Sequence, residues 1–98
     1  MAFIILFTDE ARKHLRTFPT REQKIIVSQI KIHLLNEPLT ETRRRKRMRP
    51  NPLAPWELRI DTFRVFYDVE SDTQEVIIIA IGEKKGNRVF IGGEEVQL

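Results

Sequence analysis

The residues from Trp56 to Val69, WELRIDTFRVFYDV, alternate between apolar and polar side chains. A period of two is typical of β-strands with one buried face, and its break at residues 61–62 predicts a hairpin. A two-residue turn there pairs Ile60 with Phe63 on the buried face and Arg59 with Arg64 on the other. Asp-Thr is not a favoured turn sequence, so a longer loop with a shifted register stays open.

Two arginines directly opposite each other in a hairpin are unfavourable by a few tenths to roughly 1 kcal/mol. Arg59 and Arg64 therefore favour a compensating anion, which is either a ligand or a carboxylate of the protein. The alternative is that both arginines are simply solvated or paired with Glu57 and Asp61.

Two helices are predicted between the start of the chain and the hairpin. The first follows Thr8, which suits an N-cap, and ends before Pro19, because the residue before a proline is pushed out of the α region. The second begins with a capping box formed by Thr20 and Gln23 and runs to about Asn36. Its apolar residues cover more than one stripe, which indicates either cover by the neighbouring helix or a surface for a partner.

Two further apolar runs predict strands. Residues 2–7, AFIILF, are continuously apolar, and we expect a short strand that is buried on both faces. Residues 76–81, VIIIAI, predict a strand at the centre of the sheet. We expect an extended loop over residues 39–55, which contain several prolines, and a brief apolar element at residues 89–91 before a flexible glycine pair.

The predicted element order is β-α-α-β-β-β. This order predicts an α+β fold in which two N-terminal helices pack on one face of a mostly antiparallel four-stranded sheet. The length of 98 residues predicts a single domain over residues 1–98. The other face of the sheet is expected to be open and to carry Arg59 and Arg64.

Composition excludes several classes of function. The chain contains no cysteine and two histidines, so we expect neither a thiolate nucleophile nor a metal or other cofactor. The apolar run at residues 2–7 is too short for a membrane span or a signal peptide. We therefore expect a cytoplasmic protein without a membrane partner.

Positive charge is concentrated in one segment, RRRKRMR at residues 43–49, although the formal net charge is only +3. Such a block is typical of proteins that bind a polyanion, with nucleic acid ahead of acidic protein, and the alternative is a solvated flexible loop. The candidate RNA- or ribosome-binding residues are Arg43, Arg44, Arg45, Lys46, Arg47, Arg49, Lys85 and Arg88.

The ordered set of these features resembles the RelE/ParE superfamily of toxins from type II toxin–antitoxin systems. The resemblance spans almost the whole chain. It rests on the early strand followed by T-x-x-A at residues 8–11, the Phe18-Pro19 break, the L-N-E-P helix end at residues 35–38 and the basic linker. Its most specific part is WELRIDTFRVFYDV followed by VIIIAIG and a basic turn.

RelE-like members of this superfamily are endoribonucleases that cleave mRNA in the ribosomal A site, whereas ParE-like members inhibit DNA gyrase. The resemblance implies a metal-independent mRNA interferase that inhibits translation, with the ribosome and mRNA as partners. It also implies a cognate antitoxin, bound as a hetero-oligomer. The alternatives are a ParE-like gyrase inhibitor or a catalytically weak homologue that binds nucleic acid, because the fold alone does not separate these activities.

The resemblance also implies three catalytic residues. Arg64 matches the arginine of the family's Y-R strand, which contacts the region of the scissile phosphate. Arg59 stands where the RelE-like enzymes place a lysine, and Lys84 where they place an arginine after the glycine that ends the last core strand.

Two positions depart from the pattern of the RelE-like enzymes. Glu57 replaces a basic residue, and Phe90 replaces a tyrosine that is implicated in catalysis. Because phenylalanine cannot transfer a proton, catalysis is then weak, absent or displaced onto another group such as Tyr67 or His33. Glu57 is the carboxylate best placed to act as a base, and the alternative for it is a salt bridge to one of the two arginines.

Overall fold

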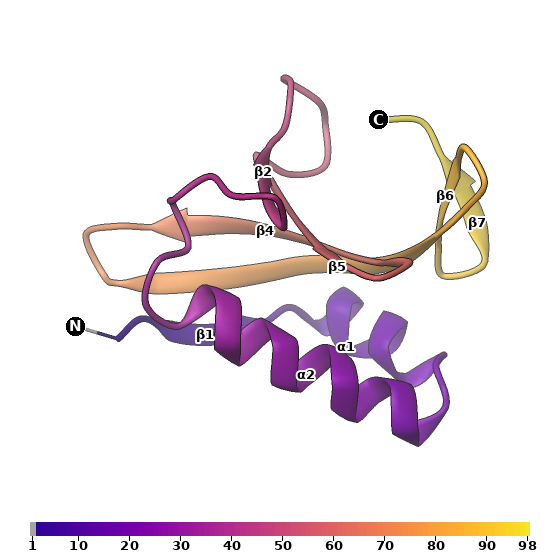
Figure 1. Ribbon diagram of the computed structural model, residues 1–98, viewed down its shortest axis with the longest axis horizontal. Helices are drawn as coiled ribbons and strands as arrows, with labels where there is room; N and C mark the ends of the chain where they lie inside the picture. Colours follow the sequence, from indigo (N-terminus) through magenta and orange to yellow (C-terminus); the bar gives the residue numbers. More distant parts are fainter. Residues whose placement is uncertain (1) are drawn as a thin grey trace.

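The computed structural model describes residues 2–98 and has two layers, a twisted sheet and a pair of helices on one of its faces (Figure 1). This arrangement confirms the predicted α+β fold with its two N-terminal helices. In chain order the elements are β1 (Ile4–Phe7), α1 (Asp9–Arg16), α2 (Thr20–Leu34), β2 (Arg45–Arg47), β3 (Trp56–Ile60), β4 (Phe63–Glu70), β5 (Glu75–Lys85), β6 (Arg88–Ile91) and β7 (Glu94–Val96).

Within residues 2–98 the sheet has seven strands, so the prediction of four was wrong. The strand order is β2-β3-β4-β5-β6-β7, and β1 pairs in parallel with β5, whereas all other pairs are antiparallel. The additional strands come from two segments. Part of the basic block forms β2 rather than a loop, and the expected glycine joint is the turn of the β6–β7 hairpin, with Gly92 and Gly93 both at positive φ.

The central hairpin has the predicted register. Arg59 lies opposite Arg64 and Ile60 lies opposite Phe63, so the turn consists of Asp61 and Thr62. Asp61 adopts a φ of 51°, a left-handed conformation that aspartate tolerates better than most residues. β5 is confirmed as the central strand, because β4 pairs along one of its edges while β1 and β6 share the other.

The prediction that the first strand is buried on both faces was wrong. β1 is an edge strand, and its side chains alternate between partly buried and exposed. Ile4 and Leu6 are 59% and 42% exposed on the face away from the helices. A continuous apolar run is compatible with both positions in a sheet, so the sequence could not distinguish them.

The start of α1 is confirmed and that of α2 is corrected. Thr8 is the N-cap of α1, and its hydroxyl accepts a hydrogen bond from the Ala11 N–H at 3.1 Å. Pro19 is the N-cap of α2, so the predicted capping box does not form. The Gln23 side chain instead donates a hydrogen bond to the carbonyl of Phe18.

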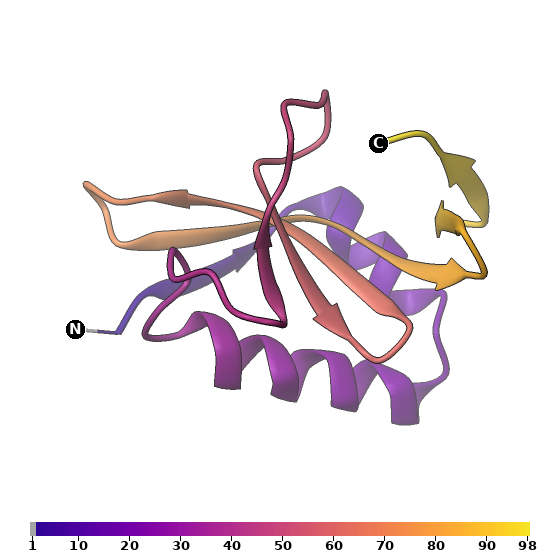
Figure 2. The same cartoon turned by 45° about the horizontal axis from the view of Figure 1, so that its top comes forward.

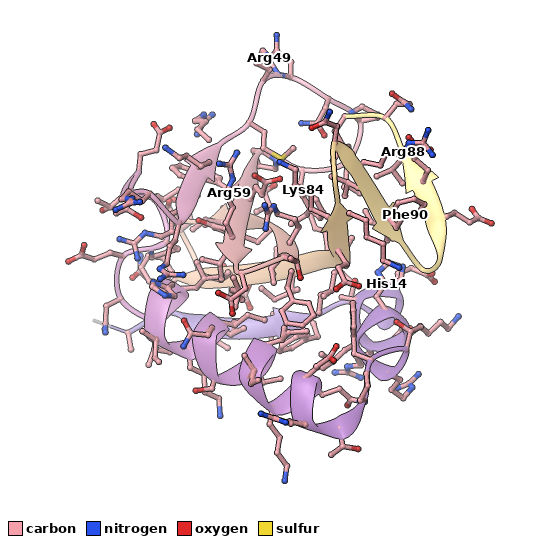
Figure 3. The ribbon with its side chains drawn as sticks, turned by 45° about the vertical axis from the view of Figure 1, so that its right-hand side comes forward. His14, Arg49, Arg59, Lys84, Arg88 and Phe90 are labelled. Carbon is pink, nitrogen blue, oxygen red and sulfur yellow. The ribbon has the colours of Figure 1, made fainter. Side chains whose placement is uncertain are left out.

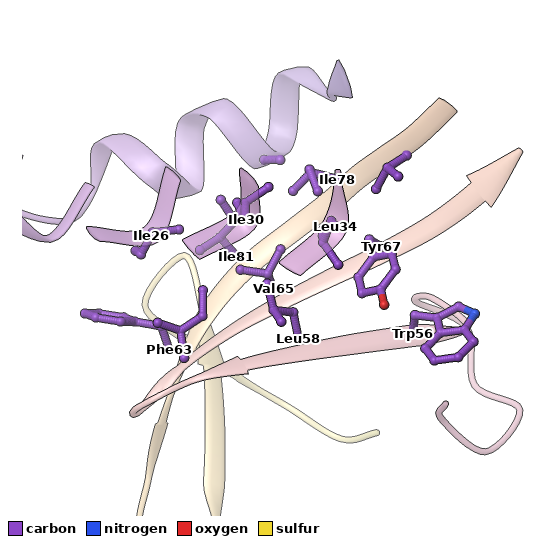
Figure 4. Packing of buried hydrophobic residues seen from close by; sticks show 13 residues of the cluster. Ile26, Ile30, Leu34, Trp56, Leu58, Phe63, Val65, Tyr67, Ile78 and Ile81 are labelled. Atoms are coloured by element: carbon purple, nitrogen blue, oxygen red, sulfur yellow. The ribbon is translucent and has the colours of Figure 1, made fainter. Parts of the chain in front are cut away.

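The main core lies between α2 and the sheet (Figure 4). Ile26, Ile30 and Leu34 follow one stripe of α2 and pack against the apolar face of β3, β4 and β5. Tyr67 is fully buried there, and its hydroxyl donates to the Pro38 carbonyl at 2.7 Å. The second apolar stripe of α2 is not covered by the neighbouring helix, since Ile32 is 63% exposed.

The opposite face of the sheet is less open than predicted. Phe66 and Ala80 are buried on this face beneath Ala54, with Leu53 packed beside them. These contacts hold residues 47–55, which we call the arm, against the sheet. The arm and the β6–β7 hairpin rise on two sides of this face (Figure 2), which we call the trough side of the sheet.

Candidate functional site

Four arginines meet at a cleft of ≈ 430 Å³ on the trough side of the hairpin, which is lined by Arg43, Arg44, Arg59, Asp61 and Arg64. The hairpin register sets Arg59 against Arg64. The backbone N–H of Arg59 donates to the Arg44 carbonyl at 2.8 Å and brings the segment before β2 to the same place. The cleft therefore combines residues that are up to 21 positions apart, 64 minus 43, in the sequence.

Arg64 is the most enclosed of these arginines, with 9% of its surface exposed. Its Nη1 donates to the carbonyls of Asp61 and Phe63 at 2.8 and 2.9 Å. Nε and Nη2 donate to no other residue of the described chain, 2–98. The turn thus fixes the plane of the guanidinium while two of its nitrogens stay available to an anion, and a planar fork of this kind suits phosphate.

The electrostatic setting of Arg64 is unfavourable to its own charge. Burial lowers the pKa of Arg64 below its ordinary value, Glu57 acts in the opposite direction, and Arg59 lowers it further. An anion bound in the cleft would relieve both the desolvation and the repulsion between the two arginines.

Glu57 supplies part of the compensating charge that the sequence predicted. It is 8% exposed and accepts a hydrogen bond from Nε of Arg59 at 2.8 Å. This ion pair is the alternative that the sequence left open for Glu57. Because Arg59 engages Oε1 of the carboxylate, Glu57 is a weaker candidate for a base than its position in the sequence implied.

Lys84 lies on the trough side of β5, two residues beyond Gly82, which pairs with Arg64. Its side chain is exposed, and its backbone N–H donates to the Thr62 carbonyl at 2.7 Å. This bond ties β5 to the turn of the central hairpin. Lys84 does not line the arginine cleft but extends its positive charge towards β6 (Figure 3).

The residues of the basic block, 43–49, have different structural roles. Arg45 is 9% exposed, and its guanidinium donates to the carbonyls of Thr40 and His33 at 2.7 and 2.8 Å, so it joins β2 to the C-terminal end of α2. The guanidinium of Arg47 lies 5.6 Å from the centre of the Trp56 ring. Lys46 and Arg49 line a second cleft beside the arm.

The remaining predicted residues lie away from the arginine cleft. Phe90 pairs with Glu83, so its ring is on the opposite side of the sheet from Arg64. Lys85 lies over that ring at 5.7 Å, and Arg88 forms an ion pair with Glu95 at 4.0 Å. The sequence could not show this separation, because one residue of register moves a side chain to the other face.

Neither of the other groups considered for proton transfer reaches the cleft. Burial raises the pKa of Tyr67 far above its ordinary value, and its hydroxyl belongs to the helix-side core. His33 contacts Gln29 and lies near Arg44 and Arg45. Burial and these two arginines lower the pKa of His33.

Sequence analysis missed the role of His14. Its Nδ1 accepts a hydrogen bond from the Ile81 N–H at 3.3 Å, on the part of β5 between its pairings with β1 and β6. Thr8 fills the same gap by donating its hydroxyl to the Ile79 carbonyl. No spacing in the sequence signals these contacts, because they join residues about seventy positions apart.

Comparison with known proteins identifies a family and a similar solved structure. A family model described as the ParE toxin of type II toxin–antitoxin systems, parDE, matches residues 5–87. The structure is similar to one chain in the crystal structure of the toxin–antitoxin complex RelBE2 from Mycobacterium tuberculosis. The TM-score is 0.71 at 25% identity, over 86% of this chain and 100% of that chain. No curated protein matches the sequence.

Proposed function

The chain belongs to the ParE toxin family of type II toxin–antitoxin systems, within the RelE/ParE superfamily, and from its arginine cleft we propose that it inhibits translation by cleaving mRNA on the ribosome. The cleft formed by Arg43, Arg44, Arg59 and Arg64 carries this proposal. Four guanidinium groups around one small space suit a substrate whose phosphates must be bound and whose charge grows during the reaction.

The proposed reaction requires no metal. The 2′-oxygen of a ribose bonds to the adjacent phosphorus and loses its proton to water, and the 5′-oxygen leaves and takes a proton from water. The phosphate becomes more negative in the transition state. Arg64 is the main donor to it, because two of its nitrogens are free and the turn holds its plane. Arg59 and Lys84 add positive charge on either side.

The contacts around the cleft favour slow chemistry. Glu57 is bound to Arg59, and Tyr67 and Phe90 lie on the other side of the sheet. A positioned acid or base typically accelerates proton transfer by about 10²- to 10⁴-fold, so relying on water forfeits a factor of this order. We therefore expect this toxin to depend on charge stabilisation and on positioning by the ribosome.

The same contacts favour a second candidate function. A toxin without a proton-transfer side chain at its basic cleft can act purely by binding, as an inhibitor of DNA gyrase. The match to the ParE toxin model and the position of Phe90, whose ring faces Lys85 rather than Arg64, favour this candidate.

We further propose a cognate antitoxin as the partner of this chain. The RelBE2 structure is that of a toxin–antitoxin complex. The face of the sheet away from the helices offers a matching surface, with basic residues at the central hairpin and exposed Ile4 and Leu6 at β1. An acidic segment with an apolar stripe would complement both parts in one hetero-oligomer.

Inducing the toxin in cells distinguishes mRNA from DNA gyrase as its target. Primer extension on abundant mRNAs should reveal new 5′ ends within coding regions soon after induction, while covalent gyrase–DNA complexes stay at the uninduced level. Trapped gyrase–DNA complexes with intact mRNA would reject mRNA cleavage and support the second candidate.

A further inference from the structure

We propose that the arginine cleft continues along the arm as a groove for single-stranded RNA, with Arg49 as its outer contact. The inference deepens the proposed function and rests on RNA being the target. A second cleft of ≈ 570 Å³ lies between the arm and the central β3–β4 hairpin. Lys46, Arg49 and Arg59 are among its lining residues. Arg59 lines both clefts, so the two adjoin at this side chain.

The direction of the groove follows from the strands. Lys46 pairs with Glu57 across β2 and β3, on the trough side of the sheet. Arg49 lies farther out on the arm (Figure 3). A row of positive charges therefore leads outward from Arg64 through Arg59 and Lys46 to Arg49. The carboxylate of Glu57 interrupts this row beside Arg59.

The arm is held in a defined shape by Asn51. The side-chain amide of this residue donates to the carbonyls of Arg49 and Ala54 at 2.7 and 2.9 Å. Its oxygen accepts the N–H groups of Leu53 and Ala54 at 2.8 and 3.1 Å. All four bonds stay within the arm, and through them Asn51 links its two sides.

Further contacts anchor this shape to the sheet. The Met48 N–H donates to the Pro55 carbonyl at 2.9 Å and closes the base of the arm. Ala54 and Leu53 pack on Phe66. Arg49 is thus presented by a preformed loop, and binding an anion costs less conformational entropy than ordering a mobile one would.

The lining of the groove fits a ligand that is recognised by its phosphates rather than by its bases. None of the side chains that line the two clefts is aromatic, because Trp56 is turned into the core at 4% exposure. Base stacking therefore contributes nothing, and recognition rests on phosphates. A charged track without stacking platforms binds single strands with little sequence preference and strong salt dependence.

The test compares two 2′-O-methyl oligouridylates, a trinucleotide that fills only the arginine cleft and a decanucleotide that reaches the arm. The 2′-O-methyl group prevents cleavage, so anisotropy of a labelled strand reports binding alone. The wild-type protein should bind the decanucleotide more tightly. Arg49→Ala and Asn51→Ala should each weaken decanucleotide binding by roughly threefold and leave trinucleotide binding unchanged.

The controls separate the preformed arm from general charge. Asn51→Ala retains every charge, so its effect reports the shape of the arm. Arg21→Ala removes one exposed guanidinium from α2, on the helix side, and should change neither affinity. In Arg49→Ala the slope of log affinity against log salt should shrink by about 0.7, the value for one lost phosphate contact on a single strand.

Equal affinities for the two oligonucleotides, or an unchanged length dependence in Arg49→Ala, would overturn the groove. Displacement by polyglutamate at the same charge concentration as RNA would also overturn it, because the arm would then fit an acidic protein. If wild-type protein binds neither oligonucleotide at low salt, the groove is overturned, whereas cleavage on the ribosome is tested separately by the appearance of new mRNA ends.

Discussion

At the scale of single residues, the function of each arginine depends on which of its nitrogens are already bonded. Arg45 and Arg64 are equally buried, at 9% exposure. Arg45 donates to two carbonyls near the end of α2 and serves the fold. Arg64 uses only Nη1 for the hairpin turn and keeps Nε and Nη2 for a ligand. Arg64 is therefore the residue on which we expect activity to depend most.

Replacing Arg64 tests this expectation. Arg64→Ala should abolish growth arrest, while Arg64→Lys should retain a small part of it, because lysine keeps the charge but lacks the planar fork. The measurement is colony formation after induction, with thermal unfolding to check that both variants fold. Undiminished arrest by folded Arg64→Ala would contradict the assignment.

Replacing Glu57 is expected to strengthen binding, whereas replacing Arg64 is expected to abolish activity. Glu57→Gln should strengthen RNA binding by roughly threefold, because Arg59 loses its carboxylate partner and the cleft gains one net positive charge. Glu70→Gln, at the exposed end of β4, makes the same change in net charge far from the cleft and should have no such effect. Weaker binding by Glu57→Gln, measured by anisotropy, would mean that the ion pair is needed to position Arg59.

At the scale of elements, β5 organises the site because it joins the arginine hairpin to both β1 and β6. Gly82 is central to this arrangement. A Cβ at this position would meet the Phe90 carbonyl oxygen at 2.4 Å, so β6 approaches closely only because a glycine stands there. The edge of β5 between β1 and β6 is completed by Thr8 and His14 from α1.

Gly82→Ala should lower the free energy of unfolding by about 1–3 kcal/mol, because the backbone of β6 must move. Gly86→Ala is the matched control. Gly86 has a φ of 63° but nothing within 4 Å of an added Cβ, so it should lose only about 1 kcal/mol from the backbone conformation. Urea denaturation measures both. A smaller loss in Gly82→Ala than in Gly86→Ala would contradict the close packing of β6.

The His14 contact predicts a pH dependence of stability. Burial lowers the pKa of His14 below 6.5, and Glu10 partly opposes this effect. Its neutral ring accepts the Ile81 N–H, so the unfolded chain binds more protons than the folded chain at acidic pH. This stability is fully present above about pH 6.5 and is lost as the pH falls through the lowered pKa of the folded state.

Urea denaturation across this pH range should show a smaller loss of stability for His14→Gln than for the wild type. His33 contributes a pH dependence of the same sign, because burial together with Arg44 and Arg45 also lowers its pKa. His33→Gln therefore measures this separate contribution. A pH profile of His14→Gln identical to that of the wild type would mean that the Ile81 contact does not hold the neutral ring.

At the scale of the whole molecule, the sequence predicted local order well and long-range assembly less well. The hairpin register was predictable because strict alternation and a two-residue turn leave few alternatives. Strands β2 and β7 were not, since each is three residues long and mostly charged. Exposed β1 was also missed, because burial of an apolar run depends on what covers it.

The candidate site was likewise predictable from the sequence only in part. The local sequence pattern predicted that Arg59 and Arg64 lie together. Arg43 and Arg44 join them through a backbone hydrogen bond between β3 and the segment before β2, which no local pattern predicts. Nothing in RRRKRMR distinguishes Arg45, which serves the fold, from its neighbours. The position of Phe90 on the far side of the sheet likewise follows from the β5–β6 register alone.

The whole molecule is small, with principal extents of 35 × 30 × 25 Å. No helix within residues 2–98 is long and apolar enough to span a membrane. The arginine cleft opens on the face of the sheet opposite the helices, so a ligand bound there would not compete with the helix layer for the same surface.

Toeprinting on programmed ribosomes with purified protein tests the central claim most directly, because it detects substrate, ribosome dependence and cleavage position together. The wild-type protein should produce new mRNA ends at the A site, and Arg64→Ala should produce none at the same concentration. Intact mRNA on ribosomes saturated with folded wild-type protein would contradict mRNA cleavage and leave gyrase as the target to examine.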